Sequence, residues 1–423
     1  MAAKKTVAKS TTKRMTSTSS TSSSKTSGGV KQVASSSITK DLIRGGVAVL
    51  ALTAALSYNF VKDTVVDMGF FLGDLQPFNT AGCEPVNGLQ ACEDIHIHHA
   101  SGLAFATCGN AESRKSWYPP MGATNASAAE SAFQDNFVIY DVPSGAYEVK
   151  ELVGLPAGTD RVFHGLGVFE RSATELTIFA VNHRRTGSVV EVLEYTIGAS
   201  EVRYIETIQH DLIHTPNDIV ATGPRSFYVS NDHRHPTGPM RHVEELLRRP
   251  WSNVIYYSPE KTFVAFEGVV SANGITGNLD NSRFYLSACH GAGVHVLEPR
   301  EDHSLDQVEF IKLDFYNDNP SLDPETGDIF VTGHVQGYKM AMDFKTPGKV
   351  IAGPSKVVKL SKNPLAETLP GAPRHVVDTV LFDDGNLIST GTVAAVDRKR
   401  GVMLIGTAFG TQGLIRCPIP QSA

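Results

Sequence analysis

The sequence predicts an all-β fold, a six-bladed β-propeller preceded by a disordered tail and one N-terminal transmembrane helix. Short β-runs recur mostly at intervals of roughly 45 to 65 residues, and most precede a polar turn and a second β-run. Hairpin units repeated at this spacing are typical of propellers. The 37 Gly and 22 Pro residues also suit a turn-rich β protein. The six runs begin at Ser101, His164, Asn217, Asn273, Asn319 and Ser389.

The first part of the chain is rich in Ser, Thr and Lys and contains few large apolar side chains. Such a segment cannot bury enough surface to offset the entropy of ordering, so residues 1–40 are expected to be disordered. Residues 1–44 hold about nine Lys and Arg against a single acid, so the rest of the chain carries a charge near −14. This acidic body indicates no nucleic-acid partner, and the sequence leaves the oligomeric state open.

Residues 41–62 contain an apolar run of about 17 residues, from Gly45 to Val61, which is near the lower limit for a membrane span. The basic tail before this run predicts a signal-anchor helix with a cytoplasmic N-terminus and a body that is luminal or extracellular. A cleaved signal peptide and a buried first helix of the fold are the alternatives. Residues 63–78 are then a linker, and residues 79–423 are the propeller domain.

Oxygen-bearing side chains follow or end short apolar runs at four distant places in the chain. Each is therefore expected at the end of a strand, and the inner strands of a propeller converge on its axis. Together they can supply the roughly six to eight oxygen ligands that a calcium ion takes. The alternative is that these residues only form turns. The four places are Glu93-Asp94, Asn217-Asp218, Asn273-Gly274 and Asp318-Asn319.

Four further stretches carry a resemblance to a known family. They are Asn217-Asp-Ile-Val-Ala-Thr-Gly-Pro with Asn231-Asp-His, Trp251-Ser-Asn-Val-Ile-Tyr-Tyr-Ser-Pro, Asp323-Pro-Glu-Thr-Gly-Asp and Leu404-Ile-Gly-Thr-Ala-Phe. Residues 79 to 419 resemble the paraoxonase/arylesterase family, whose members are calcium-dependent, six-bladed propeller hydrolases of esters and lactones.

The resemblance implies two calcium ions. A catalytic ion deep in the central tunnel would be held by Glu93, Asn217, Asn273, Asp318 and Asn319. A structural ion would be held by Asp94, Asp218 and the backbone carbonyl of Leu166. Adjacent residues can serve two ions because neighbouring side chains on a strand point in opposite directions.

The resemblance also implies a catalytic pair of histidines. His164 and His183 match the family's proposed dyad, in which one imidazole activates water and the other orients it or shuttles the proton. His334 matches a further histidine near the family's site, although Gly333 precedes it where mammalian members carry Cys. His96, His98 and His99 could suggest zinc, but no second His-rich segment supports that interpretation.

The five cysteines are an odd number, so at least one is unpaired within a single chain. The resemblance implies a disulfide between Cys83 and Cys417 that ties the two ends of the propeller together, which requires an oxidising compartment. Cys92 is expected to be buried near the metal and chemically quiet, and Cys289 to be a free thiol.

Residues 108–136 form an insertion relative to the animal members of the family. Its Trp117-Tyr118-Pro119-Pro120 segment is expected to be exposed, as part of a lid or a surface elaboration. Asn125 begins a glycosylation sequon that is usable if the body is luminal. The stretch from Arg234 to Arg249, where the family has its active-site cover, matches poorly, so the physiological substrate stays open.

The sequence therefore predicts a membrane-anchored, calcium-dependent hydrolase of aryl esters or lactones. One alternative is a gluconolactonase-like or strictosidine-synthase-like propeller, which shares a metal-centred axis but not the Asp218 site. A second alternative, from another class, is a non-catalytic calcium-stabilised propeller that binds partners through its loops.

Overall fold

The computed structural model describes residues 35–73 and 75–420. Of the tail expected over residues 1–40, residues 1–34 lie outside the described residues, and residues 35–40 are helical instead of disordered. The chain divides into two compact units, residues 1–60 and residues 61–423. Four α-helices are described: α1 (Ser35–Asp67), α2 (Ala111–Arg114), α3 (Pro239–Leu246) and α4 (Gly337–Phe344). The 3-10 helices are η1 (Pro119–Met121), η2 (Glu130–Phe133), η3 (Pro364–Glu367) and η4 (Arg398–Arg400).

Helix α1 is longer at both ends than the expected span of residues 41–62. Its segment Asp41–Asp67 has the length and composition of a membrane-crossing helix, and none of its apolar window is buried. The helix ends where Gly69 takes a φ of 75° and the Phe70 N–H turns back to the Val65 carbonyl. Glycine takes this left-handed conformation without steric cost, so it is a common helix terminator.

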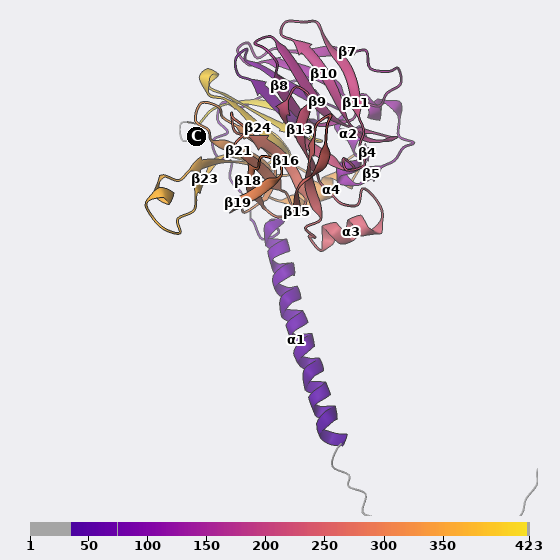
Figure 1. The fold of residues 1–423 in the computed structure, drawn as a ribbon, viewed down its shortest axis with the longest axis vertical. Coiled ribbons are helices and arrows are strands. Elements are labelled where there is room, and N and C mark those ends of the chain that lie inside the picture. Colours follow the sequence, from indigo (N-terminus) through magenta and orange to yellow (C-terminus); the bar gives the residue numbers. More distant parts are fainter. Residues whose placement is uncertain (1–34, 74, 421–423) are drawn as a thin grey trace, which may run out of the picture. The chain divides into compact units, whose positions relative to one another are not determined.

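The regular structure in the rest of the described chain is mainly β-strand (Figure 1). Three four-stranded sheets follow one another in the chain. They are β12 (Pro216–Gly223), β13 (Ser226–Asn231), β14 (Ser252–Tyr257) and β15 (Thr262–Val269); β16 (Ala272–Gly277), β17 (Phe284–Ala288), β18 (Gly293–Pro299) and β19 (Leu305–Lys312); and β20 (Tyr316–Leu322), β21 (Ile329–His334), β22 (Ser355–Lys362) and β23 (His375–Asp383).

A fourth four-stranded sheet joins the two ends of the propeller. Its strands, in spatial order, are β1 (Glu84–Pro85), β26 (Leu414–Pro418), β25 (Val402–Thr407) and β24 (Gly391–Asp397). The Cys83–Cys417 disulfide reinforces the pairing of β1 with β26, as the resemblance implies, and its partners are 334 residues apart in the chain. In the chain-entropy model, closing so long a loop contributes about 4 to 5 kcal/mol as an upper figure.

The remaining large sheet has eight strands. In spatial order they are β2 (Cys92–His98), β3 (Leu103–Cys108), β6 (Asn136–Asp141), β7 (Tyr147–Val153), β11 (Glu201–Ile208), β10 (Gly187–Thr196), β9 (Glu175–Arg184) and β8 (Phe163–Glu170). A short parallel pairing of β7 with β11 joins its two halves. A separate small ribbon pairs β4 (Trp117–Tyr118) with β5 (Ala123–Thr124).

Six inner strands, one from each four-stranded sheet and the two end strands of the eight-stranded sheet, contact one another in a closed ring. Their order is β2, β8, β12, β16, β20, β24 and back to β2. The all-β propeller is thereby confirmed. Its count of six blades stays an interpretation, in which the eight-stranded sheet is divided between β7 and β11.

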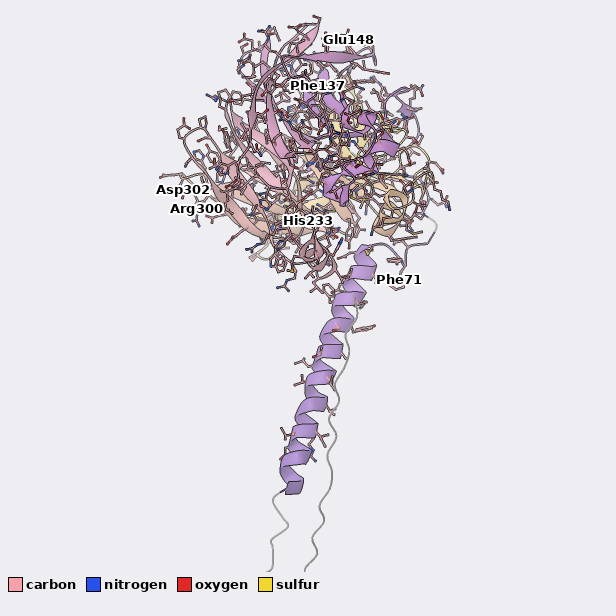
Figure 2. The ribbon with its side chains drawn as sticks, turned by 90° about the vertical axis from the view of Figure 1, so that its right-hand side faces the viewer. Phe71, Phe137, Glu148, His233, Arg300 and Asp302 are labelled. Atoms are coloured by element: carbon pink, nitrogen blue, oxygen red, sulfur yellow. A yellow bond between two sulfur atoms is a disulfide. The ribbon has the colours of Figure 1, made fainter. Side chains whose placement is uncertain are left out.

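Apolar side chains fill the space between neighbouring sheets. Tyr228 and Val254 of one sheet, for example, share a buried cluster with Ile275 and Leu286 of the next. Figure 2 shows two residues of the eight-stranded sheet, the buried Phe137 inside the molecule and the exposed Glu148 at its periphery. Fully burying such large apolar side chains contributes about 1.5 to 3 kcal/mol each, which fixes the strands that carry the site.

Candidate functional site

The inner strand of every group has an irregularity in its pairing close to its first residue. In β2 the register shifts between Cys92 and Ile95, and β8, β12, β16, β20 and β24 have equivalent shifts. Such bulges re-aim side chains that a regular strand would point to alternate faces. The residues skipped are Glu93-Asp94, His164-Gly165, Asn217-Asp218, Asn273-Gly274, Asp318-Asn319 and Thr392. The predicted pairs therefore lie in bulges and not in regularly paired strand.

Two glycines allow neighbouring bulges to approach closely. A Cβ atom on Gly165 would lie 2.4 Å from the Asp218 Cα atom, and one on Gly274 would lie 2.5 Å from the Asn319 Cα atom. These neighbours are backbone atoms that cannot move aside, so no side chain fits at either position.

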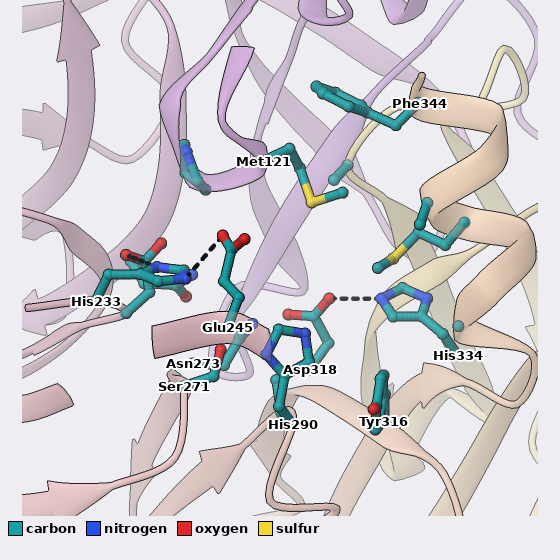
Figure 3. A pocket seen from close by; sticks show the side chains of 18 of the residues that line it. Met121, His233, Glu245, Ser271, Asn273, His290, Tyr316, Asp318, His334 and Phe344 are labelled. Atoms are coloured by element: carbon teal, nitrogen blue, oxygen red, sulfur yellow. Dashed lines mark hydrogen bonds and ion pairs between the residues drawn. The ribbon is translucent and has the colours of Figure 1, made fainter. Parts of the chain in front are cut away.

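The bulged residues form the bottom of a cavity of about 560 Å³ (Figure 3). We call this polar part the floor; the predicted residues that line it are Glu93, His164, Asn217, Asn273, Asp318 and His334. The wall of the cavity is more apolar and comes from the insertion, α3, α4 and the loop after β25. It includes Tyr118, Met121, Leu246, Met340, Phe344 and Phe409. Asn319 and His183 lie directly behind floor residues.

The five residues predicted to hold a catalytic ion are thus brought together, and several of their oxygen atoms lack a partner. The Nδ2 atom of Asn319 donates to the Glu93 Oε1 atom at 2.7 Å. The Glu93 Oε2, Asn217 Oδ1 and Asn319 Oδ1 atoms are buried and have no hydrogen bond. Within the described ranges no cluster of three His, Cys, Asp or Glu side chains forms a ready metal site. The predicted set contains only two carboxylates and is completed by Asn amides.

The second predicted set, Asp94, Asp218 and Leu166, lies behind the floor. The Asp94 Oδ2 atom accepts the Leu166 N–H at 2.8 Å, and the Asp218 Oδ2 atom accepts the Ile275 N–H at 2.7 Å. Burial and then the Glu93 charge raise the pKa of Asp94 to about 7. Burial and then the Asp94 charge raise the pKa of Asp218 well above its ordinary value. These carboxylates repel one another in a place that a cation would suit.

The two predicted catalytic histidines are hydrogen-bonded to each other. His164 Nδ1 lies 3.0 Å from His183 Nε2, and His183 Nδ1 lies 2.8 Å from the Ser188 hydroxyl oxygen. His164 Nε2 lies 3.5 Å from Glu93 Oε1. Burial disfavours the charged form of His164, but the charge and hydrogen bond of Glu93 together with the charges of Asp232 and Asp318 outweigh it, so the pKa of His164 is raised. Burial and the neighbouring His164 lower the pKa of His183 well below its usual value.

A second acid–histidine group, from the Asn231-Asp-His motif and α3, borders the cavity, and the sequence alone indicates no role for it. His233 Nδ1 lies 2.8 Å from Asp232 Oδ1. His233 Nε2 lies 3.3 Å from Glu245 Oε1 of α3, which is ion-pair distance without hydrogen-bond geometry (Figure 3). His334 Nε2, which the sequence placed near the site, lies 3.0 Å from Asp318 Oδ2.

The insertion differs from its predicted form. Trp117 and Tyr118 are 6% and 1% exposed, so the expectation of an exposed aromatic segment is wrong. The Tyr118 ring centroid lies 5.2 Å from that of His164 and 6.0 Å from that of His183. Asn125, by contrast, is exposed directly after β5. No signal in the sequence distinguished these two parts of the insertion.

The cysteines also differ in one respect. Cys92 is buried next to Glu93 as expected, but it forms a disulfide with Cys108 across strands β2 and β3. The cross-strand pairing of these two residues places their side chains together, which an odd count of cysteines did not reveal. Cys289 is the free cysteine; it is buried and borders the cavity.

Comparison with known proteins agrees with this arrangement. A family model described as Arylesterase matches residues 75–415. The chain is similar to serum paraoxonase/arylesterase 2 of Bos taurus, with 34% identity over 58% of this chain and 66% of that protein. It is 32% identical to serum paraoxonase/arylesterase 2 of Gallus gallus over 79% of this chain and 89% of that protein. It is 30% identical to serum paraoxonase/arylesterase 1 of Rattus norvegicus over 86% and 96%. The match over residues 75–415, which include every residue of the floor, shows that this chain belongs to the arylesterase family.

Proposed function

We propose that this protein is a calcium-dependent hydrolase of aryl esters, lactones or both. The observation that carries the proposal is the floor, where three unpartnered buried oxygen atoms adjoin a hydrogen-bonded pair of histidines. The apolar wall above them suits the organic part of an ester. The paraoxonases, arylesterases and lactonases among its relatives support the same class of reaction.

The residues present fit a calcium ion. Buried polar atoms without partners are costly, so the free oxygens of Glu93, Asn217 and Asn319 favour a bound cation. Asn273 and Asp318 line the same floor and would complete an all-oxygen set. When bound, the ion would polarise the substrate carbonyl and stabilise the charge that develops on its oxygen. We assign a second, structural ion to Asp94, Asp218 and the Leu166 carbonyl, where it would relieve the repulsion of the two carboxylates.

The histidines supply a base within this arrangement. If His183 carries its proton on Nδ1, toward Ser188, its Nε2 atom accepts a hydrogen bond from the Nδ1–H group of His164. In the neutral form of His164, the Nε2 atom is then free of a proton and can take one from a water molecule on the floor. His183 therefore fixes the tautomer and orientation of His164, which is the general base.

A turnover assay tests this function. The purified protein is tested on phenyl acetate and a panel of aliphatic lactones, with and without a calcium chelator. We expect hydrolysis of at least one of these substrates. The chelator should abolish this hydrolysis, and added calcium should restore it. No hydrolysis of any tested substrate by calcium-loaded protein would favour the non-catalytic propeller instead.

We further propose that the protein is a single-pass membrane protein whose body lies in the secretory pathway or outside the cell. Two disulfides in the folded unit support an oxidising compartment, and α1 has the composition of a span. The protein should stay with membranes after alkaline carbonate washing, and its body should resist protease in intact microsomes. Soluble protein with a new N-terminus after about residue 60 would indicate a cleaved signal.

A further inference from the structure

The insertion touches the main chain of both strands that carry the histidine pair. The buried Arg114 guanidinium donates through Nη2 to the Phe163 carbonyl oxygen at 3.1 Å, one residue before His164. The Trp117 indole donates through Nε1 to the carbonyl oxygen of His183 at 2.7 Å. Two residues of one short segment thus hold the backbone at both histidines.

Arg114 acts together with Asp135 to hold a single stretch of backbone. The Asp135 Oδ2 atom accepts the Phe163 N–H at 2.9 Å and the Arg114 Nη2 atom at 2.9 Å. Both the N–H and the C=O of Phe163 are therefore bound by one buried ion pair. Arg114 also donates to the Ala408 carbonyl oxygen at 2.8 Å, and its guanidinium lies 4.9 Å from the Tyr118 ring centroid.

The local sequence accommodates this pair. A Cβ atom on Gly109 would lie 2.3 Å from an Asp135 oxygen atom and 2.8 Å from Arg114 Nε, so glycine leaves the space that the pair occupies. The Cys92–Cys108 disulfide fixes the start of the insertion beside Glu93. The segment is therefore anchored to the floor at its first residue and to both histidine strands further on.

We propose that Arg114 and Trp117 are positioning residues, which hold His164 and His183 in the hydrogen-bonded geometry that the proposed hydrolysis requires. The inference rests on the proposed function for its kinetic consequence. It assigns to the insertion the orientation of the general base in addition to its part in the wall of the cavity. A misplacement of about 1 Å can lower a rate about 100-fold, so loss of either contact is expected to act on kcat.

The test compares two tryptophans. Trp117→Phe removes the indole N–H and keeps an aromatic ring, whereas Trp251→Phe is a matched control whose ring packs on His235 and Arg249. Trp117→Phe is expected to lower kcat by at least about 10-fold, with KM and calcium affinity within about twofold of the parent. Trp251→Phe should leave all three unchanged. Measurements are made well below the melting temperature of each variant.

Arg114→Lys adds a second arm, because an ammonium can keep one contact with Asp135 or Phe163 but not the whole set. Arg114→Lys should lower kcat more than Trp117→Phe does. Glu112→Gln, on the exposed side of α2, is a control that should leave kcat unchanged. Normal kcat in both folded Trp117→Phe and folded Arg114→Lys would overturn the proposal.

A spectroscopic readout separates this proposal from the proposed function. In protein with ¹⁵N-labelled histidine, the His164–His183 hydrogen bond should give a downfield proton in the parent and in Trp251→Phe. This signal should be lost or shifted in Trp117→Phe. A parent without turnover would contradict the proposed hydrolysis but leave this comparison intact. An identical signal in both variants would overturn the positioning role.

Discussion

The floor and the wall of the cavity are held in different ways. Most floor residues are bulged residues of inner strands and are buried, as for Glu93 at 1% exposure. The shape of the floor is set by backbone pairing and by glycines that admit no Cβ atom. The wall consists of short helices and loops held by side chains, and its Leu246 is 74% exposed.

This difference separates two properties of the site. A residue on the floor cannot move without displacing a neighbouring strand, so the floor suits a fixed set of ligands and a base. A residue on the wall can change with little effect on the core, so the wall suits the choice of substrate. The insertion belongs to both, because Tyr118 borders the cavity while Arg114 and Trp117 reach the histidine strands.

The largest effect is expected where the floor depends on close backbone approach. Gly165→Ala would place a Cβ atom 2.4 Å from both the Cα and Oδ1 atoms of Asp218. We expect a loss of at least about 3 kcal/mol of stability, seen as a lower melting temperature or insoluble protein. Gly73→Ala is the control, because nothing lies within 4 Å of its Cβ position. Equal melting temperatures of the two variants would show that the floor is not rigid.

Two adjacent residues then separate the functions within the floor. Asn217→Ala removes an unpartnered oxygen from the proposed catalytic ion, so turnover should fall by about two orders of magnitude or more while the melting temperature stays similar. Asp218→Ala should lower the melting temperature and weaken its dependence on calcium, because an ion bound only by the folded state stabilises that state. The same response from both variants, in kinetics and calorimetry, would contradict the assignment of two separate ions.

The residues of the floor could be predicted from the sequence far better than those of the wall, and the reason is physical. Residues such as Asn217 and Asp318 occupy equivalent bulges of a repeated unit, so a repeat and a short motif locate them. The bulges themselves were not foreseen, because pairing register depends on the partner strand. Arg114 was not foreseen either, since its contacts reach Phe163 and Ala408 in distant parts of the chain. Predicting the Cys92–Cys108 disulfide would have required knowing that β2 pairs with β3.

A smaller effect is expected at the contact between His233 and α3, and it depends on pH. Burial lowers the pKa of His233, but Asp232 and Glu245 outweigh it and raise the pKa from 6.5 to about 9. Its stabilising contribution is therefore complete below pH 6.5 and is lost as the pH rises through 9. Burial raises the pKa of Glu245, but His233 and Arg241 outweigh it and lower the pKa from 4.5 to about 2, so its contribution is lost only in strong acid.

The measurement compares melting temperatures of the parent and His233→Gln across pH. The difference should be largest between about pH 5 and 6.5 and should shrink toward pH 9. A difference that is constant over this range would show that the contact does not depend on a protonated His233.

The smallest effect is expected on the wall, at two neighbouring leucines. Leu246 borders the cavity, whereas Leu247 is 47% exposed and does not line it. Leu246→Ala removes apolar surface that a long acyl chain would cover, and about 1 kcal/mol of lost contact corresponds to roughly a fivefold rise in KM for long-chain substrates. KM for phenyl acetate and the melting temperature should hardly change, because a short substrate does not reach Leu246 and the side chain is already exposed. Leu247→Ala should leave KM for both substrates unchanged. If Leu246→Ala instead lowered kcat for long and short substrates alike, the wall would take part in the chemistry, and its separation from the floor would fail.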